Sequence, residues 1–179
     1  STFWQAGALP SQSILANFTA DANYQKDKVK WANDLVLAYG LLRQGTDAPF
    51  LKNADRIELT SKLGYQIATD PKFNLTTQFN FRTQFDKGFE FDPNFLGNRD
   101  SGNLISEFLS PAYLNLGIGF DYSASENFSL NYSPINLKMT IVLNDSLRSI
   151  YIPQDSTTGP ARYEVGSNLT IKYKREVVK

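Results

Sequence analysis

The stretch RIELTSKLGYQIAT, residues 56–69, decides the fold. Apolar side chains occupy one parity of this stretch, interrupted only by Ser61, and charged or polar side chains dominate the other. Side chains that alternate with a period of two point to opposite faces of a β-strand. The stretch therefore predicts a strand with one apolar face and one charged face.

Residues 73–85 repeat this alternation, and the Thr-Asp-Pro-Lys sequence at 69–72 favours a tight turn between the two segments. Both arms are much longer than the roughly 5–6 residues of an ordinary strand. We predict a single hairpin over residues 56–85 whose apolar face contacts lipid. The side chains expected at the lipid are those of Ile57, Leu59, Leu63, Phe79 and Phe81.

Further segments alternate in the same way, at residues 13–24, 30–41, 113–122, 128–141 and 163–172. Together with the hairpin they predict seven antiparallel strands and no helix. In the segment 128–141 the apolar parity changes at Ser133-Pro134, which predicts a bulge or a break because proline cannot donate to the sheet. The connections alternate in length: short turns lie near 26–29, 69–72 and 123–127, and long loops at 45–55, 86–111 and 144–162.

These features predict an all-β protein, an antiparallel up-and-down transmembrane β-barrel in which residues 1–179 form a single domain. The strands are long enough for the ~9–11 residues that cross a bilayer at a tilt. Their apolar parities carry almost no charge, and aromatic residues gather near the strand ends, as at membrane interfaces. The expected location is the bacterial outer membrane, with the lipid bilayer as partner. The alternative is a soluble lipocalin-like barrel whose apolar face points inward.

The composition excludes several kinds of chemistry. The 179 residues contain no cysteine and no histidine, which removes Cys/His zinc sites and histidine-based catalytic triads. The formal net charge is zero, so no overall field attracts nucleic acid. We expect no enzyme activity, no cofactor and no metal. Acidic residues of the longest loop have no calcium-loop spacing, and we interpret them as solvated; they are Asp86, Glu90, Asp92, Asp100 and Glu107.

The polar parity of the hairpin supplies the residues expected to face the lumen. They are Arg56, Glu58, Lys62, Gln78, Asn80, Arg82 and Gln84. A charged lumen would select solutes in a pore, but both signs are present close together, which favours a structural ladder of mutually neutralising charges. In the loop at 144–162, Asp145-Ser146-Leu147 and Asp155-Ser156-Thr157 fit the short O-glycosylation acceptor pattern of Bacteroidota, so Ser146 and Ser156 are possible modification sites.

Strand parity predicts that the barrel is incomplete at both ends. Single-chain bacterial barrels have an even number of strands and both termini at the short-turn side. Here the first expected strand starts at the long-loop side, and the chain ends at Val178-Lys179 without a terminal aromatic residue. We therefore expect the first and last strands not to pair with each other.

Several short motifs follow one another along the chain: WQAG at 4–7, LAYGL at 37–41, DRIEL at 55–59, NFRTQF at 80–85, FLSPAY at 108–113, and SP at 133–134 followed by KMTIV at 138–142. This ordered set resembles a Bacteroidota outer-membrane barrel family known only as domain of unknown function 3078. The resemblance departs at Phe3 and at Gly7-Ala8, where the family has asparagine and Gly-Gly. It implies a barrel of around a dozen strands, one upstream and several downstream of this segment, and it implies no activity.

Three functions follow as expectations. The first is a structural or accessory subunit of an outer-membrane assembly, with other outer-membrane proteins as partners. The second is a porin-like channel for small solutes, and the third is a soluble barrel that binds an apolar ligand.

Overall fold

The computed structural model of the protein describes residues 10–46, 48–67, 72–90, 102–153 and 159–175. It contains one sheet of seven strands in which every neighbouring pair is antiparallel. In spatial order the strands are β1 (Ser11–Lys26), β2 (Val29–Gln44), β3 (Leu51–Gln66), β4 (Phe73–Thr83), β7 (Ala112–Ser125), β8 (Phe128–Ile141) and β9 (Ala161–Tyr173). The prediction of an all-β antiparallel fold with seven long strands is confirmed.

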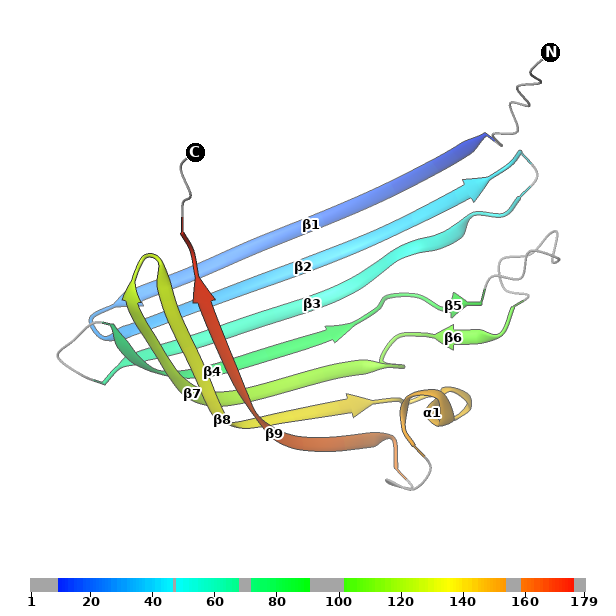
Figure 1. The fold of residues 1–179 in the computed structure, drawn as a ribbon. Helices are drawn as coiled ribbons and strands as arrows, with labels where there is room; N and C mark the ends of the chain where they lie inside the picture. Colours follow the sequence, from blue (N-terminus) through cyan, green and yellow to red (C-terminus); the bar gives the residue numbers. More distant parts are fainter. Residues whose placement is uncertain (1–9, 47, 68–71, 91–101, 154–158, 176–179) are drawn as a thin grey trace, which may run out of the picture.

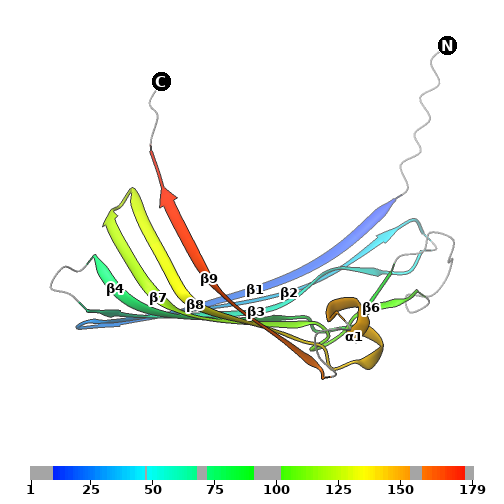
Figure 2. The same ribbon diagram turned by 60° about the horizontal axis from the view of Figure 1, so that its bottom comes forward.

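The sheet is open. Among the described residues, β1 pairs only with β2 and β9 pairs only with β8, so the two strands form opposite edges (Figure 1). The predicted lack of pairing between the first and last strands is confirmed. Figure 2 shows that the sheet is strongly curved, with β7, β8 and β9 turning sharply part-way along their length.

The predicted hairpin is present. β3 and β4 pair continuously from Ile57 opposite Thr83 to Gln66 opposite Asn74. This register places Leu59 opposite Phe81 and so brings the apolar side chains of both arms to one face. β3 is longer than predicted, since it begins at Leu51 instead of Arg56 and shortens the connection from β2.

β8 is bulged where the apolar parity changes. Ile118 pairs with Ile135 and Phe120 with Tyr132, so Ser133 and Pro134 together oppose the single residue Gly119. Two β8 residues opposing one residue of the partner strand are what defines a bulge. The predicted register change at Ser133-Pro134 is confirmed.

Two of the long connections contain secondary structure that was not predicted. β5 (Gly88–Phe89) and β6 (Leu104–Ser106) form a two-stranded sheet, and α1 (Asp145–Tyr151) is a helix. The prediction of no helix was therefore wrong. Asn144 caps α1 by accepting a hydrogen bond from the Ser146 amide, and Leu147 is buried. A helix this short has no repeated apolar period, and packing rather than propensity stabilises it.

A small core lies at the loop end of the sheet. Val142, Leu147 and Ile152 are buried there, and Leu104 and Tyr151 pack against them. Among the described residues no helix is long and apolar enough to cross a bilayer.

Candidate functional site: a polar hollow on the concave face

The polar side chains that alternate along each strand lie on the concave face of the sheet. The Lys62 ammonium on β3 pairs with the Asp121 carboxylate on β7, across the intervening strand β4. A shallow depression is lined jointly by Lys62 and by Lys172 on β9, four strands away in the sheet order. Side chains of such distant strands line one depression only on the inner side of a curved sheet, so the concave face carries the polar residues.

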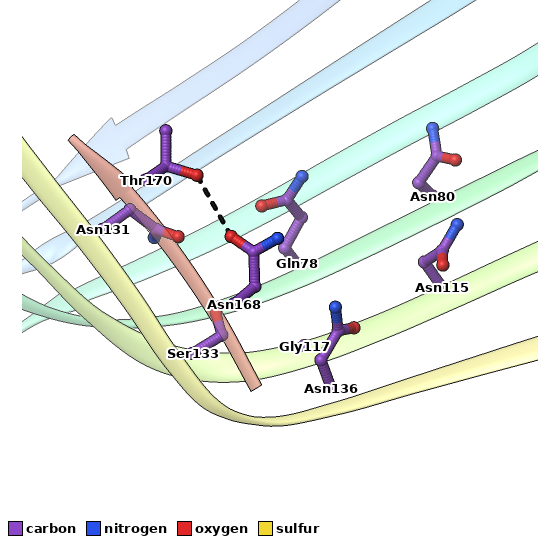
Figure 3. Close-up of a pocket in the computed structure, with 9 residues that line it drawn as sticks. All are labelled: Gln78, Asn80, Asn115, Gly117, Asn131, Ser133, Asn136, Asn168 and Thr170. Atoms are coloured by element: carbon purple, nitrogen blue, oxygen red, sulfur yellow. Dashed lines mark hydrogen bonds between the residues drawn. The ribbon is translucent and has the colours of Figure 1, made fainter. Parts of the chain in front are cut away.

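A polar hollow of this face lies on β4, β7, β8 and β9 and has a volume of about 320 Å³ (Figure 3). Every side chain that lines it is uncharged. Amides predominate, from Gln78, Asn80, Asn115, Asn131, Asn136 and Asn168. Ser133, Thr170 and Gly117 complete the lining.

The bulge and two glycines shape the hollow. A Cβ on Gly119 would lie 2.1 Å from the Tyr132 carbonyl oxygen and 2.6 Å from the Ser133 Cα, so only glycine fits opposite the bulge. A Cβ on Gly117 would meet the Ser133 hydroxyl at 3.5 Å and the Asn136 side-chain oxygen at 3.6 Å. The glycines thus let β8 approach β7 closely and aim the Ser133 and Asn136 side chains into the hollow.

Some amides of the hollow have protein partners and others do not. Asn131 donates to the Asp121 carboxylate, Asn80 donates to the Thr60 hydroxyl at 2.9 Å, and the Thr170 hydroxyl donates to Asn168 at 3.1 Å. Within the described parts of the chain, the side chains of Gln78, Asn115 and Asn136 make no hydrogen bond. These amides therefore retain donors and acceptors for water or a ligand.

Several charged residues of the concave face pair with each other. Arg56 binds Glu58 at 2.8 Å, and Lys138 binds Glu164 at 3.2 Å, with Arg162 adding a contact to the same carboxylate at 3.1 Å. Most of these side chains remain partly exposed, so each pair contributes little to stability. Their effect is to leave the concave face polar with little net charge.

The sheet brings most residues predicted to face the lumen to this face. Arg56, Glu58, Lys62, Gln78, Asn80 and Arg82 share it, with Glu58 directly opposite Arg82. Gln84 differs, because it follows the end of β4 and its amide donates to the backbone oxygens of Glu107 at 2.6 Å and Pro111 at 3.3 Å. Gln84 therefore fixes the loop that contains Glu107 and Pro111, and it is absent from the lining of the hollow.

Other predicted sites lie at the loop end. Ser146 is exposed in the first turn of α1, and its hydroxyl donates to Asn144 at 2.7 Å. Ser156, Asp92 and Asp100 lie outside the described residues. Of the other loop acids, Glu107 accepts from the Asn144 amide at 3.0 Å, and Asp86 accepts from the Tyr39 hydroxyl at 3.0 Å. No described cluster of His, Cys, Asp or Glu side chains has the arrangement of a metal site.

Sequence reasoning missed most of the hollow. The residues from β7, β8 and β9 alternate as clearly as Gln78 and Asn80, but the lumen prediction used the hairpin alone. The available signal was the run of asparagines on the polar parity together with the pair Gly117 and Gly119.

Family comparison agrees with the resemblance seen in the motifs. Residues 1–89 match the family model described as Protein of unknown function (DUF3078). This part of the chain belongs to that family. The predicted DUF3078 membership is confirmed, and it carries no assigned activity. Neither the curated proteins nor the solved structures contain a significant match.

Proposed function

We propose that this DUF3078 chain forms part of the wall of a transmembrane β-barrel in a bacterial outer membrane, as a structural or accessory subunit of an outer-membrane assembly. The observation that carries the proposal is the convex face, which is apolar, almost free of charge and exposed. By the resemblance of its motifs, the source would be a member of the Bacteroidota and the complete barrel would have around a dozen strands.

The convex face exposes large apolar side chains along every strand of the sheet. Val165 on β9 is 78% exposed, Ile14 on β1 is 64% exposed, and Phe18 is 56% exposed. Between the strand ends the convex positions hold no Asp, Glu, Lys or Arg except Asp55 on β3, whose side chain is only 4% exposed. Water-soluble proteins rarely expose apolar patches larger than a few hundred Å². A lipid environment would cover this face without any further partner.

Aromatic residues line up at the short-turn end of the convex face. The register sets Tyr24 opposite Trp31, Phe73 opposite Tyr122, and Phe128 opposite Tyr173. The Phe73 ring lies 6.4 Å from the Tyr122 ring and 5.8 Å from the Phe120 ring. Such a row is typical of the aromatic girdle at a membrane–water interface.

Strand length and curvature support the same proposal. β1, β2 and β3 each have 16 residues, above the ~9–11 that a tilted membrane strand needs. The polar face is concave and the apolar face convex, whereas a lipocalin-like barrel requires the reverse. The curvature therefore disfavours the soluble alternative.

A channel for small solutes is the second candidate, and the hollow of Figure 3 favours it. The mutual pairing of the charges on the concave face favours the structural role instead, because paired charges attract no ions. Conductance of the full-length protein in a planar bilayer separates the two. The structural role predicts no current, and the channel predicts stepwise currents.

The membrane proposal is tested by an adjacent pair of substitutions in the middle of β3. We expect Leu59→Arg, on the convex face, to reduce the stability of the full-length protein in lipid vesicles by about 2–4 kcal/mol, the cost of arginine at the bilayer midplane. Thr60→Arg, on the concave face, should cost less than about 1 kcal/mol because its side chain stays in water. Urea unfolding followed by tryptophan fluorescence measures both. Equal effects, or a wild-type protein that stays in the aqueous phase, would contradict the proposal.

A further inference from the structure

The unpartnered amides of the hollow are the starting point. Gln78 on β4, Asn115 on β7 and Asn136 on β8 belong to three adjacent strands, and their side chains line one hollow (Figure 3). Each amide offers two N–H donors and one oxygen acceptor. A ligand that carries donors and acceptors close together would satisfy all three.

The charge of the surroundings narrows the ligand class. The lining holds no charged side chain. At one end Lys62 and Asp121 pair with each other, and Asn131 donates to the same aspartate. Lys172 is the other charged side chain at that end. An anion or cation in the hollow would lose hydration without meeting an opposite charge, which makes ion binding costly.

We propose that this hollow binds a neutral, polyhydroxylated solute, a mono- or oligosaccharide, through the amides of Gln78, Asn115 and Asn136. Each sugar hydroxyl both donates and accepts, and therefore matches an amide. The volume of about 320 Å³ falls at the lower end of small-molecule sites, which span roughly 300–1,000 Å³. The lining contains no aromatic ring for the sugar to stack on, so binding is weak and suited to a solute in passage.

Sugar binding would give the channel function a substrate class. It rests on that proposed function because it requires the concave face to border the interior of a barrel. The test measures binding to the full-length protein in a phosphocholine detergent, since sugar-based detergents would compete for the site. The probes are glucose and maltotriose, followed by saturation-transfer NMR. Sodium acetate and ethanolammonium chloride serve as charged probes of similar polarity.

We expect both sugars to bind and neither ion to do so. The double substitution Asn115→Ala with Asn136→Ala should weaken sugar binding by about tenfold, as the loss of two hydrogen-bonding side chains implies. Gln78→Ala, on β4 and so outside the bulged strand pair β7–β8, should weaken binding by about threefold. This single variant keeps the test valid if the double variant misfolds. Asn17→Ala is the matched control, because Asn17 lies on the same face on β1 and outside the hollow.

Each other outcome would overturn the proposal: no saturable sugar signal, preference for either ion, or equal weakening by Asn17→Ala. The sugar-binding measurement also tests a different point from the membrane proposal. A protein that inserts into vesicles but does not bind sugars refutes only the ligand. A protein that binds sugars but stays in the aqueous phase refutes only the membrane location.

Discussion

Asp55 shows what a single carboxylate does in the first part of β3, near the long-loop end of the sheet. Its side chain is only 4% exposed and accepts from the Lys52 ammonium at 2.6 Å and from the backbone amides of Phe85 at 2.7 Å and Asp86 at 3.0 Å. The Lys52 ammonium also donates to the Asp86 carbonyl at 2.7 Å. One buried carboxylate thus attaches the segment that leaves β4 to the neighbouring strand β3.

Removal of this carboxylate should be costly. We expect Asp55→Ala to lower the free energy of unfolding by about 3 kcal/mol, because it leaves a buried lysine and two amides without their acceptor. Asp145→Ala is the matched control, since Asp145 pairs with Arg148 at the same i,i+3 spacing but its side chain is 85% exposed. The control should cost less than about 1 kcal/mol. Denaturant unfolding measures both, and similar losses would contradict the anchoring role.

Gly119 is a second residue on which the shape of the sheet depends. We expect Gly119→Ala to destabilise the protein by about 2 kcal/mol, because the new methyl group collides with the backbone of the bulge. At Gly64 a Cβ would meet its nearest neighbour, the Lys30 carbonyl oxygen, at 3.7 Å, which is an ordinary contact. Gly64→Ala should therefore leave stability unchanged or raise it by about 0.5 kcal/mol. A harmless Gly119→Ala in the same unfolding assay would refute the close approach of β7 and β8.

At the scale of elements, α1 and β6 act as a unit that covers the loop end of β7 and β8. The Tyr151 hydroxyl donates to the Ile105 carbonyl oxygen at 2.5 Å, next to the buried side chains of Val142 and Leu147. Burial raises the pKa of Tyr151 above its ordinary value of 10.0, and repulsion from Tyr113 adds to the shift. The neutral hydroxyl is the form that this unit stabilises.

The stability of this unit should therefore fall at high pH. The folded-state pKa lies above the unfolded value, so the contribution of Tyr151 is present below pH 10 and is lost as the pH rises further. We expect Tyr151→Phe to cost about 1 kcal/mol at neutral pH through the lost hydrogen bond and to reduce the loss of protection above pH 10. Hydrogen exchange of α1 amides between pH 8 and pH 11, corrected for intrinsic rates, measures this. Tyr173→Phe, on the edge strand, is the control, and an unchanged pH profile in Tyr151→Phe would contradict the assignment.

At the scale of the whole molecule, the open edges determine what the sheet requires of its surroundings. In the part of the chain that the structure describes, β1 and β9 each have a neighbouring strand on one side only. An unpaired backbone amide or carbonyl in hydrocarbon costs several kcal/mol, so lipid cannot cover these edges. The edges need further strands or protein if the sheet lies in a membrane.

This requirement predicts a protection pattern. In the full-length protein inserted in vesicles, another strand must pair with the β1 amides that point away from β2. These amides should therefore exchange as slowly as those of β3. Hydrogen exchange detected by mass spectrometry measures the difference between the two strands. Fast exchange along β1 in the bilayer would show an edge open to water and contradict a closed barrel.

The local chemistry of the chain determines the strands by itself. Alternation at residues 56–69 and 73–85 predicts both arms of the hairpin, and the parity change at Ser133-Pro134 predicts the bulge, because face and register follow directly from a period of two. The amides that line the hollow also follow this alternation, although Gln78 and Asn80 are the only lining residues among the seven predicted to face the lumen.

Only the tertiary structure decided which face is concave. Alternation with a period of two assigns the side chains to two faces, but it does not show toward which face the sheet bends. The tertiary structure also decided that Asn115 and Asn136 share a hollow with Asn168, because pairing of β7, β8 and β9 brings together residues distant in the chain. α1 was not predicted because its seven residues depend on the Asn144 cap and on contacts of Leu147, which no local sequence pattern reveals. Strand identity is a property of local alternation, whereas curvature, the hollow and the helix depend on long-range packing.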